Sequence, residues 1–267
     1  MEIQTGKHLR HTLTRPGALI SLLVLAAAAG VGGALAGGGA AAAGAVGAVI
    51  LIWFLVVVVV AVRRAQRDFY AAYAQQRGLR WDHHASVPAA TPLLRRGDSR
   101  RADEAFEGKL PGDLDGELAL YTYEESGSGT SDAKEIHHFT IVVSPLPGLE
   151  ARLPGLFVQR RSGFRFLDGA EDVFRKTERI ELESEELDRK CEIFADRRCD
   201  AVWLRQLFEP SFVDFLAEGS PEGFAFEVEN GTLCVNVNRH RGKAAELDGL
   251  CEAAATVAKR IVEEVNE

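Results

Sequence analysis

Residues 16–62 form one long apolar stretch without a single Asp, Glu, Lys or Arg. A helix needs about 20 apolar residues to cross a bilayer core, so this stretch is long enough for two passes. Gly37, Gly38 and Gly39 lie near its middle and favour a break there, because glycine is a poor helix former and a good turn residue. We therefore predict a transmembrane helical hairpin, with helices over about 17–36 and about 41–62.

Basic residues flank the apolar stretch on both sides: Lys7, Arg10 and Arg15 before it, and Arg63, Arg64 and Arg67 after it. Segments rich in Lys and Arg stay on the cytoplasmic side of a membrane. We expect a multi-pass protein of the bacterial inner (plasma) membrane, with both termini and the soluble domain in the cytoplasm. A cleaved secretory signal in place of the first helix is an alternative, and it leaves the large domain on the same side.

Strand-like alternation begins well after the membrane segment. The runs 117–124 and 135–144 are rich in Tyr, Thr, Ile, Val and Phe, and the Gly- and Ser-rich segment 126–132 separates them. This order predicts an antiparallel hairpin with a flexible loop. Apolar residues occur on both faces of these strands, which indicates central positions in a sheet.

A second hairpin is predicted around Asn230-Gly231, because Asn-Gly favours a two-residue turn in which both positions need positive φ. The turn pairs Phe226 with Val235 and places apolar residues on one face. Glu227 then points to the other face, which we expect to be exposed. Phe226→Asp should accordingly unfold the domain and Glu227→Lys should have little effect.

Apolar residues recur every three or four positions over 243–265, which predicts an amphipathic helix that covers the sheet. The fold class is thus α+β: antiparallel hairpins with covering helices, after a transmembrane hairpin. We assign residues 1–15 to a basic cytoplasmic N-terminus, 16–62 to the two membrane helices and 101–267 to the soluble domain. Residues 63–100 are assigned to a basic juxtamembrane helix, which Gly78 should end, and a connector.

The segment 181–217 is expected to contain a strand, a helical turn, a second strand and two helices, the last with a capping box at Ser211 and Asp214. This order resembles a bacterial family of two-span membrane proteins known only as a domain of unknown function. The resemblance rests on these residues: Glu183, Ser184, Arg189, Ile193, Asp196, Ala201, Leu207, Pro210 and Leu216. Leu187 and Asp188 stand where the family has Phe-Asn. The resemblance implies a fold and a topology, and no activity.

Charge is distributed unevenly, although the whole chain carries 31 Lys and Arg against 39 Asp and Glu. Residues 63–101 contain 9 Arg and 3 Asp, a net charge of +6, and the remainder of the chain is strongly acidic. Arg63, Arg64 and Arg67 could contact anionic lipid headgroups or could act only on topology. The acidic domain argues against nucleic-acid binding. The surplus of Arg over Lys and the many Ala residues suggest a GC-rich bacterial gene.

We identify no catalytic, cofactor or metal site from the sequence. The glycines around Gly32 lie inside a predicted membrane helix, and no phosphate-binding motif is present. His137 and His138 are neighbours on a strand and point to opposite faces, so they cannot share one ion. The pair His83-His84 could join His240 on a metal only if the fold brings them together. The four cysteines have no C-x-x-C spacing and are expected to be reduced thiols.

Two functional hypotheses follow. The missing catalytic motifs and the predicted anchor favour a non-enzymatic scaffold, sensor or regulatory module at the membrane, with the bilayer and an unidentified protein as partners. The alternative is an enzyme or small-ligand-binding domain whose site the sequence does not show. A pocket that gathers several polar side chains would favour the alternative.

Overall fold

The structure is a computed structural model that describes residues 25–29, 31, 39–126, 134–149, 153–161, 175–182 and 184–266. The chain divides into two compact units, Met1–Tyr73 and Ala74–Glu267. The helix α3, Gly39–Arg77, supplies the last residues of the first unit and the first residues of the second.

In the described part of the chain, one helix is long and apolar enough to cross a membrane: the stretch Ala43–Arg77 of α3. It contains the second predicted span, and large apolar side chains there are exposed, including Leu51, Ile52 and Leu55 at 60%, 60% and 54%. The first predicted span lies mostly outside the described residues, so a helical hairpin is not shown. The helix ends at Arg77 and Gly78 follows with a φ of 65°, as predicted.

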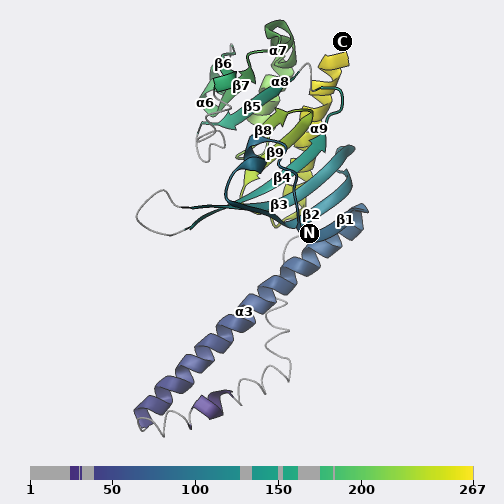
Figure 1. The fold of residues 1–267 in the computed structure, drawn as a ribbon. Helices are drawn as coiled ribbons and strands as arrows, with labels where there is room; N and C mark the ends of the chain where they lie inside the picture. The colour runs from purple at the N-terminus through teal and green to yellow at the C-terminus, as the bar shows by residue number, and fades with distance from the viewer. Residues whose placement is uncertain are drawn as a thin grey trace. The chain divides into compact units, whose positions relative to one another are not determined.

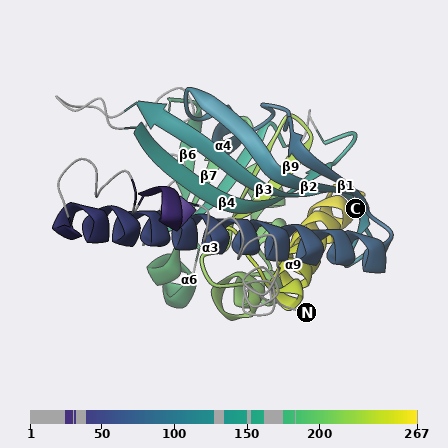
Figure 2. The ribbon, with the colours of Figure 1, turned by 90° about the horizontal axis from the view of Figure 1, so that it is seen from below.

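The described residues of the second unit form a nine-stranded antiparallel sheet with the order β1-β2-β3-β4-β9-β8-β5-β7-β6. Figure 1 shows its path, and Figure 2 shows the long strands β2, β3 and β4 side by side. The strands are β1 (Arg80–Ala85), β2 (Ser99–Leu110), β3 (Leu114–Ser126), β4 (Lys134–Pro145), β5 (Gly155–Arg160), β6 (Thr177–Ile180), β7 (Cys191–Asp196), β8 (Ala225–Glu229) and β9 (Thr232–Asn238). The helices are α4 (Pro92–Arg95), α6 (Glu185–Lys190), α7 (Ala201–Leu207), α8 (Pro210–Asp214), the π-helix η1 (Phe215–Gly219) and α9 (Ala244–Asn266).

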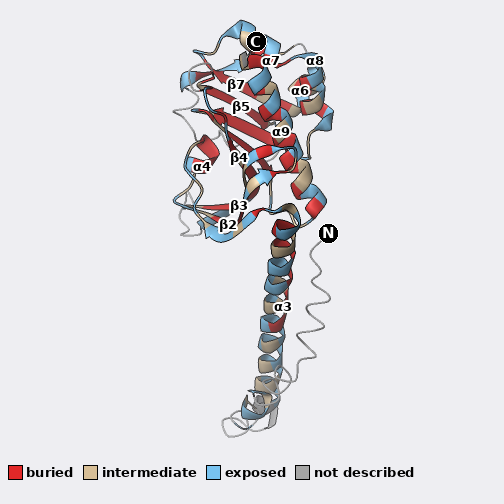
Figure 3. Cartoon of the chain, turned by 90° about the vertical axis from the view of Figure 1, so that its right-hand side faces the viewer, coloured by how far each residue is buried: buried red, intermediate tan, exposed pale blue. Residues whose placement is uncertain are grey.

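The sheet is covered on both faces. The amphipathic helix α9 packs against β3, β4 and β9, as its sequence period predicts. On the opposite face, Leu93 and Leu94 of α4 belong to a buried cluster that includes Tyr121, Tyr123 and Phe139. Figure 3 shows α4 and α9 on opposite sides of the strands. The segment that we expected to be a connector therefore holds β1, α4 and the start of β2, and it supplies part of the core.

The turn of the second hairpin is confirmed, since Asn230 and Gly231 have φ values of 49° and 71° and Phe226 pairs with Val235. The expected exposure of the other face is wrong. Glu227 is 0% exposed, and the two oxygens of its carboxyl group share the amide N–H of Leu93 as hydrogen-bond acceptors, at 3.0 and 3.2 Å. The register was correct, but α4 covers the face that alternation alone marked as polar.

The segment after β5 follows its predicted order with two differences. We expected the first strand to begin at residue 181, but the strand β6 ends at Ile180 and residues 181 and 182 lie outside it. The capping box at Ser211 and Asp214 does not form: Glu209 is the N-cap of α8, and the helix continues into the π-helix η1, which ends at Gly219. Proline at the first position of α8 explains this start, because its missing N–H needs no partner there.

Candidate metal centre

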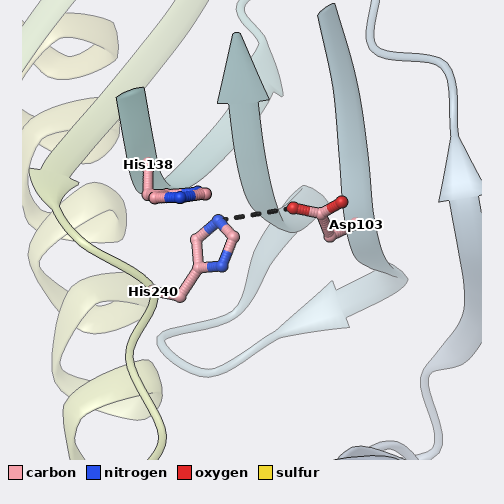
Figure 4. A group of neighbouring side chains, drawn as sticks. All are labelled: Asp103, His138 and His240. Carbon is pink, nitrogen blue, oxygen red and sulfur yellow. Dashed lines mark ion pairs between the residues drawn. The ribbon is translucent and has the colours of Figure 1, made fainter. Parts of the chain in front are cut away.

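Three side chains from separate stretches meet on the face of the sheet opposite α4. Asp103 comes from β2, His138 from β4 and His240 from the residues that join β9 to α9 (Figure 4). One potential ligand atom from each residue lies within 4.8 Å of the others. Carboxylate and imidazole groups are common metal ligands, and the fold holds each of the three in a different way.

A β-bulge accounts for the direction of Asp103. Ala102 pairs with Tyr121 and Glu104 pairs with Leu120, so Asp103 is the additional residue between two successive pairs of β2 and β3. A bulge interrupts the alternation of a strand and redirects one side chain. The Asp103 carboxylate thereby reaches the hydroxyl of Thr122, which donates a hydrogen bond to Oδ2 at 2.6 Å.

His240 is held by a short turn that Thr140 fixes from both sides. The Thr140 hydroxyl donates to the carbonyl of Arg239 at 2.9 Å and accepts from the amide of Arg241 at 2.9 Å. Arg239 has a φ of 72° and its amide donates to the carbonyl of His138. The two neighbours of His240 are thus bonded to β4, and the imidazole ring lies 4.7 Å from the ring of His138, measured between centroids.

Thr122 lies at the centre of the cluster. Its Oγ1 is 2.9 Å from Nδ1 of His138 and 3.3 Å from Nε2 of His240, in addition to the bond with Asp103. Nε2 of His240 also lies 3.2 Å from the carbonyl oxygen of Tyr121, to which it can donate. Register explains the placement of His138, because Thr122 and His138 are directly paired across β3 and β4.

The protonation states of Asp103 and His240 suit a cation. Partial burial acts to raise the pKa of Asp103, but hydrogen bonds from Thr122 and Arg101 outweigh it and hold the pKa below its ordinary value. Burial holds the pKa of His240 below its ordinary value, with His138 acting in the same direction. At neutral pH the site therefore presents an ionised carboxylate and a neutral imidazole at His240.

The surroundings of the cluster orient its carboxylate. Nε of Arg101 donates to Oδ1 of Asp103 at 2.8 Å, and another nitrogen of the same guanidinium bonds Glu124 at 3.0 Å. Oδ2 is left facing His240, at 3.8 Å from its Nε2. The side chains of Asp103 and His240 are 25% and 26% exposed, and His138 is exposed. An ion from solution therefore has a direct route to the three side chains.

The other residues considered from the sequence lie elsewhere. His137 points away from His138, as expected for neighbours on a strand, and its ring stacks on Tyr123 at 4.8 Å between centroids. His83 and His84 lie on β1, where Nδ1 of His83 is 3.2 Å from Oε1 of Glu104. His240 is thus joined by His138 and Asp103 instead of by His83 and His84. The bulge and the turn that create this grouping have no signal in the sequence.

All four cysteines are described in the structure, and none of them forms a disulfide bond. Burial raises the pKa of Cys191, Cys199 and Cys234, which keeps these thiols protonated. Protonated thiols are weak nucleophiles and poor metal ligands, so these three residues add no reactive group.

No family model matches the chain, and no curated protein is similar to it in sequence. Among solved structures, the chain is similar to the crystal structure of the mycobacterial trehalose monomycolate transport factor A, TtfA. The identity is 11%, the TM-score is 0.44, and the match covers 76% of this chain and 95% of that one. A likeness at this level carries no argument about fold family or activity.

Proposed function

We propose that the chain is an integral membrane protein that holds a regulatory or sensor domain at the cytoplasmic face of a bacterial inner membrane. The observation that carries this proposal is the apolar part of α3. Helices buried in soluble proteins cover their apolar side chains, whereas Ile50, Leu51, Ile52, Phe54 and Leu55 are between 45% and 60% exposed. A lipid environment removes this area from water.

Arg63, Arg64 and Arg67 support the cytoplasmic placement of the domain. They follow the apolar stretch directly and are exposed on α3. Arginine at the end of a span favours retention on the cytoplasmic side. The same residues would contact anionic headgroups, with a contribution of about 1 kcal/mol for each charge near the surface.

Reporter fusions test the topology. A reporter active only in the cytoplasm, fused after residue 15 or at Glu267, should be active in both positions, and a periplasmic reporter should be inactive in both. An external N-terminus with a cytoplasmic C-terminus would leave one span and reject the proposed pair. Release of the intact chain by an alkaline carbonate wash would reject integration altogether.

Vesicle binding tests the role of the arginines. The chain beginning at Arg63 should bind vesicles with anionic headgroups weakly, and salt should release it because exposed charges are screened. Replacement of Arg63, Arg64 and Arg67 by Gln should abolish this binding. Equal binding to neutral vesicles would assign the contact to apolar side chains, and no binding at low salt would restrict the arginines to topology.

A second candidate function is supported by the cluster of Asp103, His138 and His240. Three polar groups, two from separate strands and one from the residues after β9, converge there within 4.8 Å, as is typical of ligand-binding sites. Under this alternative the domain is a ligand-binding module or an enzyme. Loss of a cellular phenotype on replacing these residues, with the fold and the membrane location intact, would favour it over a scaffold.

A further inference from the structure

We propose that Asp103, His138 and His240 form a binding site for one divalent transition-metal ion on the face of the sheet opposite α4. This inference goes beyond the membrane role, and it does not depend on the topology of the chain. It rests on the convergence of three donors, on their separations and on the way the fold fixes each of them (Figure 4).

The separations fit one ion after a small adjustment. Zinc binds imidazole nitrogen and carboxylate oxygen at about 2.0–2.2 Å, which places two ligands of a tetrahedral ion about 3.4 Å apart. Nε2 of His240 and Oδ2 of Asp103 are 3.8 Å apart. The whole donor set spans at most 4.8 Å, and the exposed ring of His138 can turn to close the remainder.

The fold places two of the donors in advance. The bulge in β2 directs Asp103, whose Oδ1 is held by Arg101, and the bonds of Thr140 to Arg239 and Arg241 hold the backbone on either side of His240. Hydrogen bonds that orient ligands are a regular part of metal sites. A binding ion would therefore need to order only the ring of His138.

The donor types select the class of ion. Two imidazoles and one carboxylate suit Zn²⁺ and its neighbours in the first transition row, whereas Ca²⁺ and Mg²⁺ prefer oxygen ligands throughout. Nε2 of His240 binds an ion in the tautomer whose proton is on Nδ1, so binding replaces the contact of Nε2 with the carbonyl of Tyr121. Three protein ligands leave at least one coordination position for water or for a partner's side chain.

The competing interpretation is a hydrogen-bond network that needs no ion. Thr122 Oγ1 contacts all three residues, so its hydroxyl can satisfy them by itself. The two interpretations differ in metal affinity. A hydrogen-bond network alone binds no ion tightly, whereas at a metal site the loss of any one of the three donors weakens binding.

Metal titration of the full chain distinguishes them. The protein is purified in detergent with any histidine tag removed, stripped with a chelator and titrated with Zn²⁺ against a chromophoric chelator. We expect one ion for each chain. Asp103→Asn, His138→Ala and His240→Ala should each weaken binding at least about tenfold. Absorption of bound Co²⁺ should change in the same three variants.

The control is the double variant of His83→Ala and His84→Ala, which removes two neighbouring imidazoles on β1, with ring centroids 4.1 Å apart, and should leave binding unchanged. Circular dichroism in chelator should show that every variant is folded, and the exposed position of His138 makes its variant the safest in this respect. Absence of binding to the wild-type chain, equal affinity in the three site variants, or a loss of binding in the control would each overturn the proposal.

Discussion

Glu227 shows at the scale of one residue how alternation can be correct and still mislead. Its side chain points away from Phe226, as the hairpin register requires, and yet it is 0% exposed. Side chains alternate with the same period of two residues whether one face of the sheet is exposed to solvent or both faces are covered. The sequence therefore assigns Glu227 to the face opposite Phe226, and the packing of α4 decides that this face is buried.

Both Glu227→Lys and Phe226→Asp should strongly destabilise the domain. Each variant buries a charge without a partner, at a cost of roughly 3–5 kcal/mol in the free energy of unfolding. Glu222→Lys is the matched control, because Glu222 is exposed and should change stability little. Denaturant titration of the three variants measures the effect. A stable Glu227→Lys variant would mean that α4 does not cover this face.

Glu227 should also make stability depend on pH. Burial raises the pKa of Glu227 to about 8, partly offset by the hydrogen bond from the amide of Leu93. The folded state therefore retains a proton that the unfolded state releases near pH 4.5. The contribution of Glu227 to stability is full below this value and is lost as pH rises through about 8.

Glu227→Gln should remove this part of the pH dependence, since the amide does not titrate. Between about pH 5 and pH 9 the free energy of unfolding of the wild-type chain should fall by a few kcal/mol relative to that of Glu227→Gln. The expected size is on the order of 1.4 kcal/mol for each unit of pKa shift. Denaturant titrations across this range provide the measurement. Parallel curves for the two proteins would show that Glu227 does not titrate in this window.

At the scale of elements, local patterns predicted the best-defined parts of the domain. The helix expected over 243–265 is α9, Ala244–Asn266, and the first hairpin is formed by β3 and β4. Both elements are long and periodic, so their local sequence pattern and their tertiary contacts favour the same secondary structure. The short α4 has four residues and no periodic signal, and its Leu93 and Leu94 form a helix because the sheet packs against them.

Two glycines in these elements should respond in opposite ways to Ala. At Gly116 in β3 an added methyl group would collide with the carbonyl oxygen of Val143, so Gly116→Ala should destabilise the domain by roughly 1–3 kcal/mol. At Gly249 in α9 nothing lies within 4 Å of the added carbon, so Gly249→Ala should stabilise by up to about 1 kcal/mol. Thermal melts of both variants should move in opposite directions, and a shift of the same sign would contradict the packing described for one of the two sites.

At the scale of the whole molecule, the first strand and α4 belong to the folded unit. The unit begins at Ala74, and β2 begins at Ser99, before the boundary at residue 101 that we expected from the sequence. A fragment 101–267 lacks Leu93 and Leu94, so Tyr121 and Tyr123 lose part of their cover. The extent of the core therefore decides which fragment folds.

We expect residues 74–267 to fold alone in water and residues 101–267 to aggregate or to remain loosely packed. The longer fragment also keeps Arg77, whose Nε donates to Asp248 at 2.6 Å. Size-exclusion chromatography, circular dichroism melts and binding of a hydrophobic dye compare the two fragments. Equal, cooperative melting of both would show that β1 and α4 contribute little to the core.

Features that depend only on neighbouring residues could be predicted from the sequence. The apolar helix, its basic end, the Asn230-Gly231 turn and the amphipathic helix α9 follow from composition and period, because each forms through contacts within a few residues. Tertiary structure alone decided the burial of Glu227 and the meeting of Asp103, His138 and His240. Those features need segments more than 100 residues apart in the chain, a β-bulge and a strained turn, and none of these leaves a local pattern.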